Sequence, residues 1–195
     1  MIDLKKLAKE YANKPQEQRN QQSPRSFHLT KELHELQLPK YAKMRFPKQG
    51  DIREIEFLIT PEEGLWKNGN FLFNFKYPTE YNIMPPYVRC LTKTYHPIIE
   101  YENISMSIQR RSRFEHDGGW TPLSGTIDII QSLFFNFMEP CGEDALNVQV
   151  GILMLKDYDQ FKKNVEASFR GEIVDGVQYE KQPINYDFPE NVKTE

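Results

Sequence analysis

The sequence predicts an α+β fold, with an N-terminal helix, a four-stranded antiparallel meander, a long loop and C-terminal helices. Two observations lead to this class. Helical spacing of apolar residues occurs at the start of the folded part and again after residue 122, whereas the segments between alternate apolar and polar residues. No internal repeat is visible, so the pattern describes one layered body and not a repeat array.

The first helix is expected in "FHLTKELHELQLP". Leu29, Leu33 and Leu36 recur on one helical face there, and Pro39 ends the helical pattern. The alternating segments "IREIEFLIT" and "GNFLFNFKY" follow, separated by the turn-rich "PEEGLWKNG". This arrangement predicts a hairpin of two antiparallel strands. A further strand, "PPYVRCLTK", begins with two prolines.

A long irregular stretch, residues 95–122, comes next and contains Gly118, Gly119 and Pro122. The segments "TIDIIQSLFFNFM" and "NVQVGILMLKDYDQFKKNVEASFR" then have helical spacing. We interpret Leu133, Phe134, Phe135 and Phe137 as core residues and not as a ligand-binding cluster.

The domain organisation follows from changes in composition. Residues 1–26 are expected to hold a short amphipathic peptide and a polar, Gln/Asn-rich linker with two prolines. Isolated helices as short as this peptide are marginal in water, so it is expected to order only against a partner. Residues 27–180 form the predicted domain, and residues 181–195 read as a tail.

Composition narrows the function classes. The chain has 195 residues, 38% of them hydrophobic and 27% charged, which is typical of a soluble globular protein. A net charge of -3 argues against a nucleic-acid partner. Two cysteines cannot form a disulfide framework. The apolar run "IIQSLFFNFM" is too short to span a bilayer, and "MIDLKKLAKEY" lacks the apolar core of a secretory signal.

No metal or cofactor is expected. The four histidines have no ligand spacing, and His28 and His34 are six residues apart on the predicted helix. The acidic pairs Glu62–Glu63 and Glu143–Asp144 fall in turns, where solvated charge is the ordinary explanation. The segment "NGNF" is a hairpin turn and not a phosphate-binding loop.

Several motifs in this order resemble the ubiquitin-conjugating enzyme family, and within it the branch that conjugates the cullin-modifying, Nedd-type modifier. The resemblance covers about residues 28–180 and implies the UBC fold, a cytoplasmic or nuclear location, and a cysteine that carries the modifier as a thioester. The motifs are "LTKELHELQLPK", "ITPEEGLWKNGNFLFNFK", "PPYVRC", "YHP", "WTPLSGTIDIIQSLFFNFMEP", "EDALN" and "SFRGEIVDGVQY".

The loop that should carry the chemistry departs from the family pattern. His96 and Pro97 are kept, but Ile98 stands where the family has an oxyanion-stabilising asparagine. Ser105 stands where the resemblance places the catalytic cysteine, and Glu102 where a glycine is usual. A serine hydroxyl is hardly ionised at neutral pH without an adjacent base. We therefore expect no catalytic residue, only degenerate positions, and a protein that is not an enzyme.

Neither cysteine is expected to replace the missing one. Cys90 falls in a predicted strand, and Cys141 follows the "EP" at a helix end. A lone cysteine-to-serine change would be typical of an engineered trap, whereas the additional Ile98 favours natural divergence.

Candidate partner-binding residues lie in three places. The N-terminal peptide resembles the segment by which the Nedd-type enzyme docks its activating enzyme. The double proline lies in a region that binds ligases in the family, where Asn82 replaces a usual proline. The segment 110–119 is a loop insertion directly before Trp120, with arginines and an aromatic residue, which are favoured at interfaces. The candidates are Ile2, Leu4, Leu7, Tyr11, Pro85, Pro86, Arg110, Arg111, Arg113, Phe114 and Trp120.

Three functions remain open from the sequence. The first expectation is an inactive interaction module or accessory subunit of a multi-subunit assembly, in the cytosol or in an organelle. The second is a regulator that binds the activating enzyme or a ligase of Nedd-type conjugation. The third is a residual conjugating enzyme that uses Ser105. The sequence names neither the partner nor the compartment.

Overall fold

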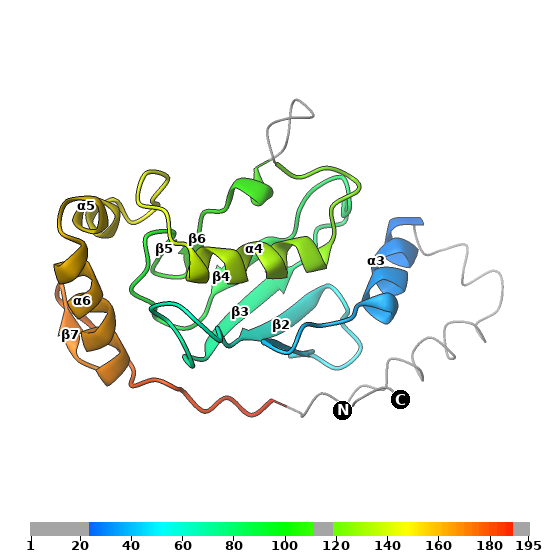
Figure 1. Cartoon of the computed structure of the whole chain (residues 1–195). Helices are drawn as coiled ribbons and strands as arrows, with labels where there is room; N and C mark the ends of the chain where they lie inside the picture. The colour runs from blue at the N-terminus through cyan, green and yellow to red at the C-terminus, as the bar shows by residue number, and fades with distance from the viewer. Residues whose placement is uncertain (1–23, 111–118, 189–195) are drawn as a thin grey trace.

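A twisted antiparallel sheet with one long helix across its inner face forms the centre of the structure (Figure 1). The computed structural model describes residues 24–110 and 119–188. The elements are α3 (Pro24–Glu35), β1 (Ala42–Arg45), β2 (Glu54–Ile59), β3 (Phe71–Lys76), β4 (Tyr87–Cys90), β5 (Ile99–Glu100), β6 (Asn103–Ile104), the 3₁₀ turn η1 (Ser107–Gln109), α4 (Thr126–Met138), α5 (Val148–Lys156), α6 (Tyr158–Arg170), β7 (Ile173–Val174) and β8 (Val177–Gln178).

The main sheet has the strand order β1-β2-β3-β4-β6-β5. Strands β1 to β4 pair antiparallel in sequence order, which confirms the predicted α+β class and its meander. The structure adds β5 and β6, which form inside the long loop and extend the sheet beyond β4. Strands of two residues are too short to show a periodicity, so the sequence pattern did not reveal them.

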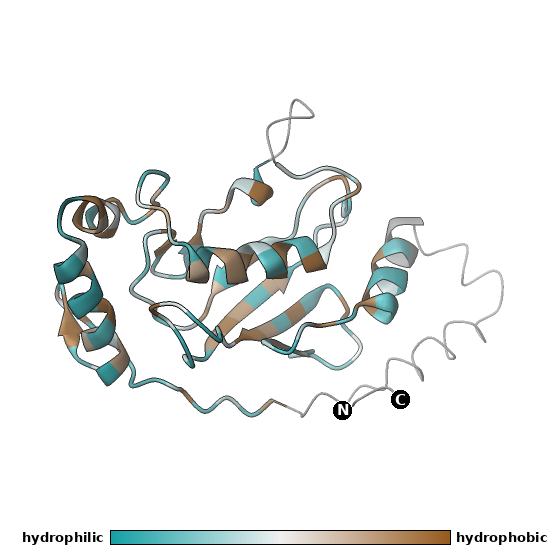
Figure 2. Cartoon of the chain, viewed as in Figure 1, coloured by the Kyte–Doolittle hydropathy of each residue, from teal (hydrophilic) through white to brown (hydrophobic). Residues whose placement is uncertain are grey.

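Alternation gives the sheet an inner face rich in aromatic residues. Ile55, Phe57 and Ile59 of β2 are fully buried, and they lie opposite Phe75, Phe73 and Phe71 of β3. Successive side chains of a strand point to opposite faces, so these six residues share one face. Figure 2 shows the corresponding apolar stretches of the strands beneath α4.

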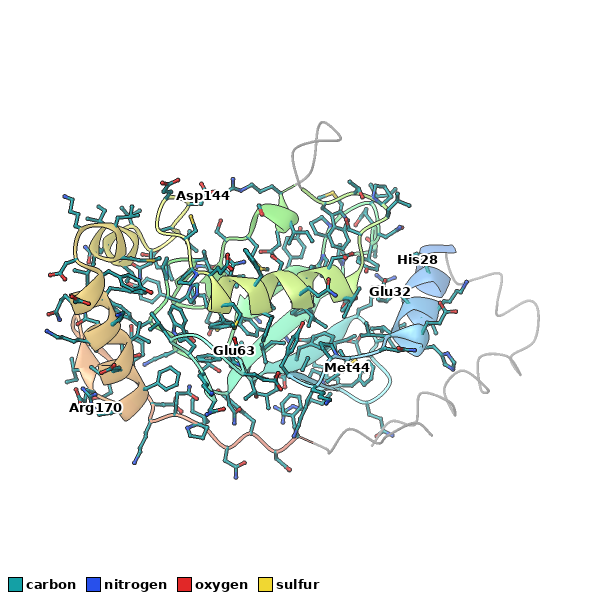
Figure 3. The ribbon with its side chains drawn as sticks, viewed as in Figure 1. His28, Glu32, Met44, Glu63, Asp144 and Arg170 are labelled. Carbon is teal, nitrogen blue, oxygen red and sulfur yellow. The ribbon has the colours of Figure 1, made fainter. Side chains whose placement is uncertain are left out.

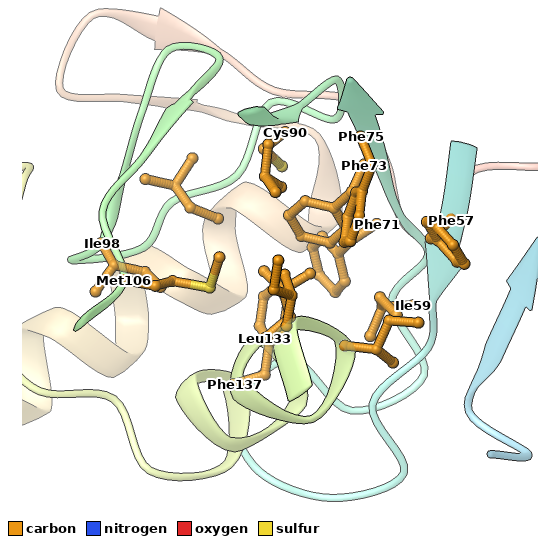
Figure 4. Packing of buried hydrophobic residues seen from close by; sticks show 14 of the residues in the cluster. Phe57, Ile59, Phe71, Phe73, Phe75, Cys90, Ile98, Met106, Leu133 and Phe137 are labelled. Atoms are coloured by element: carbon orange, nitrogen blue, oxygen red, sulfur yellow. The ribbon is translucent and has the colours of Figure 1, made fainter. Parts of the chain in front are cut away.

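Helix α4 closes this face (Figure 4). Ile129, Ile130, Leu133 and Phe137 are buried on the side of the helix that meets the sheet. Phe135, in contrast, is 57% exposed. Neighbouring residues of a helix point about 100° apart, so consecutive aromatics cannot all enter one core.

The carboxylate of Glu32 connects α3 to the start of α4. Glu32 of α3, labelled in Figure 3, accepts hydrogen bonds from the Thr126 amide and from the Tyr81 hydroxyl, the latter at 2.6 Å. Negative charge is favourable at a helix N-terminus, where amide groups lack partners. The Asp128 side chain also accepts a bond from the Gly125 amide, at 2.7 Å. These bonds set where α4 begins.

The C-terminal helical region divides at Asp157. This residue ends α5 and caps α6, since its side chain accepts a hydrogen bond of 2.9 Å from the Gln160 amide. Gly171 then ends α6 with a left-handed φ of 80°, and the turn brings its Cα against the Lys181 backbone. Among the described residues, no helix combines the length and apolar character that crossing a bilayer requires.

His96 connects the core to the long loop. Its ring is only 1% exposed and lies between Trp66 and Phe137, with centroid distances of 4.4 Å and 5.2 Å. One ring nitrogen, Nε2, is 3.0 Å from the carbonyl oxygen of Asn136, and Nδ1 accepts a 3.1 Å bond from the Ile98 amide. These partners select the neutral tautomer with its proton on Nε2.

Burial lowers the pKa of His96 to about 3, although the bond to the Asn136 carbonyl opposes this shift. In the unfolded chain the imidazole returns to its ordinary pKa of about 6.5. Between these two values the unfolded state binds one proton more than the folded state. The free energy of unfolding therefore falls as the pH is lowered through this window.

We predict that His96 makes the protein about 2 kcal/mol less stable at pH 5 than at pH 7. The measurement is urea unfolding at both pH values for the unmodified chain and for His96→Gln, in which this contribution disappears. His34→Gln is the matched control, because His34 is exposed on α3. An equal pH dependence in the unmodified chain and His96→Gln would contradict the prediction.

Candidate functional site

The candidate site is a tight hairpin between His96 and Ser105. Strands β5 and β6 pair Ile99 with Ile104 and Glu100 with Asn103. Tyr101 at the tip has a left-handed φ of 54°. The Ser105 amide closes the hairpin with a 3.0 Å bond to the Ile98 carbonyl. This backbone bond holds Ser105 directly beside the His-Pro segment.

The Ser105 side chain lies at the edge of the hairpin and is half-buried. Within residues 24–110 and 119–188, no acidic, basic or imidazole side chain forms a hydrogen bond to its hydroxyl. His96 cannot act as its base, because both ring nitrogens are occupied and the ring is neutral and buried. The hydroxyl is therefore accessible but not activated by a neighbouring residue of the described part.

Ile98 has become part of the core. Its side chain is 4% exposed and lies near Met106 in the buried cluster (Figure 4). An isoleucine side chain has no hydrogen-bond donor, and the Ile98 amide already donates to His96. The position for which the resemblance predicts an oxyanion donor is thus used here for packing.

The charge of Glu102 is partly balanced. Its carboxylate is 3.3 Å from the Arg89 guanidinium, and both side chains are more than half exposed. Ion pairs this exposed contribute little to stability. The Glu102 carbonyl also accepts a 2.9 Å bond from the Cys90 amide, which attaches the hairpin to β4.

The two cysteines differ in accessibility. Cys90 is buried, its thiol donates to the Thr92 carbonyl at 3.1 Å, and burial raises its pKa to about 12. A thiol with this pKa is not a nucleophile at neutral pH. Cys141 is exposed on the loop between α4 and α5.

The loop between α4 and α5 borders the site. The sequence did not predict this contact. The Asn147 amide donates a 2.8 Å hydrogen bond to the Pro97 carbonyl, and the Asn147 side chain caps α5 by accepting from the Val150 amide. Asn147 belongs to the motif "EDALN", and this motif was the only sequence signal for the contact.

Four of the other candidate residues, Pro85, Pro86, Arg110 and Trp120, lie in the described part of the chain. Pro86 is buried and Pro85 half-buried where the chain enters β4. Trp120 is 2% exposed. Its backbone amide donates a 2.7 Å hydrogen bond to the Arg110 carbonyl, which joins the two ends of the insertion. Seven candidates lie outside the described residues: Ile2, Leu4, Leu7, Tyr11, Arg111, Arg113 and Phe114.

Two exposed apolar residues near Asn82 were not among the binding residues predicted from the sequence. Ile83 is 40% exposed and Leu123 is 97% exposed. Asn82 holds their loops together, because its carbonyl accepts a 2.7 Å bond from the Trp120 indole and its side-chain amide donates to the Pro122 carbonyl. An isolated apolar residue in a loop carries no periodicity, so sequence pattern does not reveal its exposure.

No group of histidine, cysteine, aspartate or glutamate side chains suited to a metal ion occurs in the part of the chain that the structure describes.

Comparison with known proteins gives a consistent result. Residues 28–169 match the family model described as "Ubiquitin-conjugating enzyme". The chain is 31% identical to a Nedd8-conjugating enzyme, UbcE2M, of Drosophila melanogaster, over 92% of this chain and 96% of the relative. It is 34% identical to the NEDD8-conjugating enzyme UBC12 of Eremothecium gossypii, over 81% and 83%. The solved structure of S. cerevisiae Ubc12 superposes with a TM-score of 0.72 and 26% identity, covering 90% of this chain and 91% of that one.

These findings correct one expectation from the sequence. The conclusion that the chain is not an enzyme is wrong, because relatives over 30% identical along most of its length are conjugating enzymes and the matching structure is a Ubc12. The error came from equating residue type with activity, although an accessible hydroxyl can still accept an acyl group. The fold, the matched family model and the relatives together place this chain in the ubiquitin-conjugating enzyme family, related to its Nedd-type members.

Proposed function

We propose that this chain is a conjugating enzyme for a Nedd-type modifier, and that Ser105 occupies the position of the catalytic cysteine and carries the modifier as an ester. The observation that supports this most directly is the half-buried Ser105 hydroxyl, held beside the His-Pro segment by the bond from its own amide to the Ile98 carbonyl.

The proposed reaction consists of two successive acyl transfers. The Ser105 oxygen attacks the carbonyl carbon of the modifier's C-terminal thioester on the activating enzyme. The carbon–sulfur bond breaks, the thiolate leaves, and the hydroxyl proton passes to water. A lysine amine of the target then attacks the ester carbonyl, the carbon–oxygen bond breaks, and Ser105 takes up a proton as an isopeptide bond forms.

Both steps are slow for reasons visible in the site. No described side chain takes the Ser105 proton, so the nucleophile remains an alcohol. In the second step Ile98 offers no donor to the oxyanion, and loss of one such donor typically costs about 10²–10³ in rate. The enzyme therefore favours a long-lived ester over rapid transfer.

The partners under this proposal are a Nedd-type activating enzyme and a ligase. The N-terminal peptide with Leu4 and Leu7 is the segment we assign to the activating enzyme, on its resemblance to the family's docking peptide. The exposed Ile83 and Leu123, in two loops joined through Asn82, form the surface that we assign to the ligase. An apolar centre with a polar rim is typical of such interfaces.

We predict that incubation with Nedd-type activating enzyme, ATP and modifier yields an adduct that resists thiol reductants and is cleaved by alkali. Ser105→Ala should lower its yield by at least about tenfold, because the acceptor oxygen is lost. Ser107→Ala is the matched control, since Ser107 is exposed two residues further along in η1 and should leave the yield unchanged. An adduct that mass spectrometry maps to Cys141, or no adduct under conditions that charge an active relative, would contradict the assignment.

We predict that Ser105→Cys converts the adduct into one that thiol reductants release, and speeds its formation by at least about tenfold at pH 8. A thiol with an ordinary pKa is substantially ionised at that pH, whereas a serine is not. Single-turnover charging, followed on non-reducing gels, measures the rate. Equal charging rates for Ser105 and Ser105→Cys would show that another residue is the acceptor.

We predict that Leu123→Asp lowers ligase-stimulated discharge of the modifier by about tenfold or more, because it places a charge in the centre of the proposed interface. Charging by the activating enzyme should not change. Leu155→Asp is the control, since Leu155 is also exposed but lies on α5. Equal loss in both variants would argue against a ligase surface at the Asn82 loops.

A further inference from the structure

Helix α5 is apolar on both of its faces. Its nine residues, "VQVGILMLK", include only two polar side chains, those of Gln149 and Lys156. On the inner face, Val150 is buried, and Leu153 and Met154 pack against the main core. A helix that is apolar all round is normally covered on every side. The core covers only one side of α5, so the outer side is free to bind another segment.

The outer side of α5 carries an exposed apolar stripe. Val148 is 60% exposed, Ile152 47% and Leu155 60%. Because consecutive residues of a helix lie about 100° apart, these three side chains fall within an arc of about 60°. Figure 2 shows α5 as a mostly hydrophobic helix, and Figure 1 shows it at one end of the molecule. We call Val148, Ile152 and Leu155 the α5 stripe.

An acidic loop is packed against this helix. Gly142 and Ala145 belong to the loop before α5, and both contact Gly151 of the helix. A Cβ added at Gly151 would clash with the Ala145 side chain and lie 2.7 Å from the Gly142 carbonyl oxygen, so only glycine allows this close approach. Glu143 and Asp144 lie between these two contacts and are exposed, and Asp144 is labelled in Figure 3. The packing of the loop therefore holds two carboxylates beside α5.

Carboxylates also lie at the C-terminal end of α5. Asp157 and Asp159 are exposed directly after the helix, and Lys162 pairs with Asp159 at 3.8 Å. Lys156, in the last turn of α5, and Lys162 offset part of this negative charge. Acidic side chains thus lie beside the α5 stripe and at its C-terminal end, which favours an occupant that carries basic residues.

The N-terminal segment, residues 1–11, has the complementary pattern in its sequence "MIDLKKLAKEY". Its apolar residues Leu4, Leu7 and Tyr11 are spaced by three and four residues, and its three lysines lie between them. The α5 stripe is spaced by four and three residues. Two helices that run antiparallel therefore bring the two sets of apolar residues into register, with Leu4 opposite Leu155.

We propose that the N-terminal segment covers the α5 stripe of its own chain as a short antiparallel helix. The apolar side chains then meet in the centre, and the lysines lie near the acidic residues around α5. A helix of this length is marginal in water, so the contact itself supplies its order. This contact does not depend on ester formation at Ser105. Its regulatory consequence rests on the proposed function, since a segment bound to α5 is not available to an activating enzyme.

The linker is long enough for the segment to reach α5. Residues 12–23 span about 40 Å when extended. A domain of this size is about 40 Å across. Figure 1 shows α3, which begins at Pro24, and α5 at opposite ends of the molecule. A tether of this length also gives the segment an effective concentration of about 1 mM, which compensates for a small interface.

The test uses the full chain and a fluorescent peptide with the sequence of residues 1–11 as the probe. The host variant is Leu4→Asp with Leu7→Asp, in which the chain's own segment no longer competes with the probe. Gln21→Asp with Gln22→Asp is the matched control, since it adds the same charge to the linker. Fluorescence anisotropy should show at least about tenfold tighter binding of the probe to the host variant than to the unmodified chain or the control.

A second set of variants locates the binding. Added to the host variant, Ile152→Asp should abolish probe binding, because it places a charge in the centre of the α5 stripe. Ile173→Asp is the matched control, since Ile173 is 67% exposed but lies on β7. Reversing the acidic pair, with Glu143→Lys and Asp144→Lys, should weaken binding at least about tenfold. Circular dichroism melting establishes that each variant is folded before binding is measured.

Absence of probe binding by the folded host variant, or equal binding by the host variant and the unmodified chain, would overturn the proposal. So would a loss of binding in Ile173→Asp as large as that in Ile152→Asp. A concentration-dependent dimer of the unmodified chain that Leu4→Asp with Leu7→Asp dissociates would also overturn it, since a second copy would then supply the segment. A chain that shows the expected probe binding but forms no ester at Ser105 would refute the proposed function alone.

Discussion

The stacking of Phe137 on Phe71 is the contact on which most of the structure depends. The ring centroids are 4.5 Å apart, and the pair joins α4 to the inner face of the sheet. Phe137 also meets Trp66 and His96 edge-on, so the same side chain reaches the loop that leads to the site. Aromatic side chains bury large areas with defined geometry, which makes this cluster both a source of stability and a spatial reference.

The contacts that hold the backbone of the hairpin are therefore distinct from the side chain of Ser105. His96 is held by Trp66, Phe137 and the Asn136 carbonyl, and its ring in turn receives the Ile98 amide. These contacts do not involve the Ser105 side chain. Ile98 reinforces the frame by packing in the core, and its side chain carries no hydrogen-bond donor.

Much of the fold was accessible from the sequence, and the site was accessible only in part. Alternating aromatics predicted β2 and β3, and helical spacing predicted α3 and α4, because burial on one face imposes these periods. The family resemblance predicted that His96, Ile98 and Ser105 mark the site, and this assignment stays a prediction. It did not show that the Asn147 amide bonds Pro97, that Leu123 is exposed, or that Glu32 caps α4, because these contacts join residues with no shared pattern. The inference of inactivity relied on residue type alone, and the relatives contradicted it.

By itself, the sequence determined the α+β class and the order of its main elements, since both depend on local periodicity and turn chemistry. The tertiary structure alone decided the protonation state of His96, the low reactivity of Cys90 and the burial of Leu58 and Leu72. Each of these properties depends on desolvation, which is set by atoms brought together from distant parts of the chain. A sequence records which groups are present, whereas only the fold decides which of them still meet water.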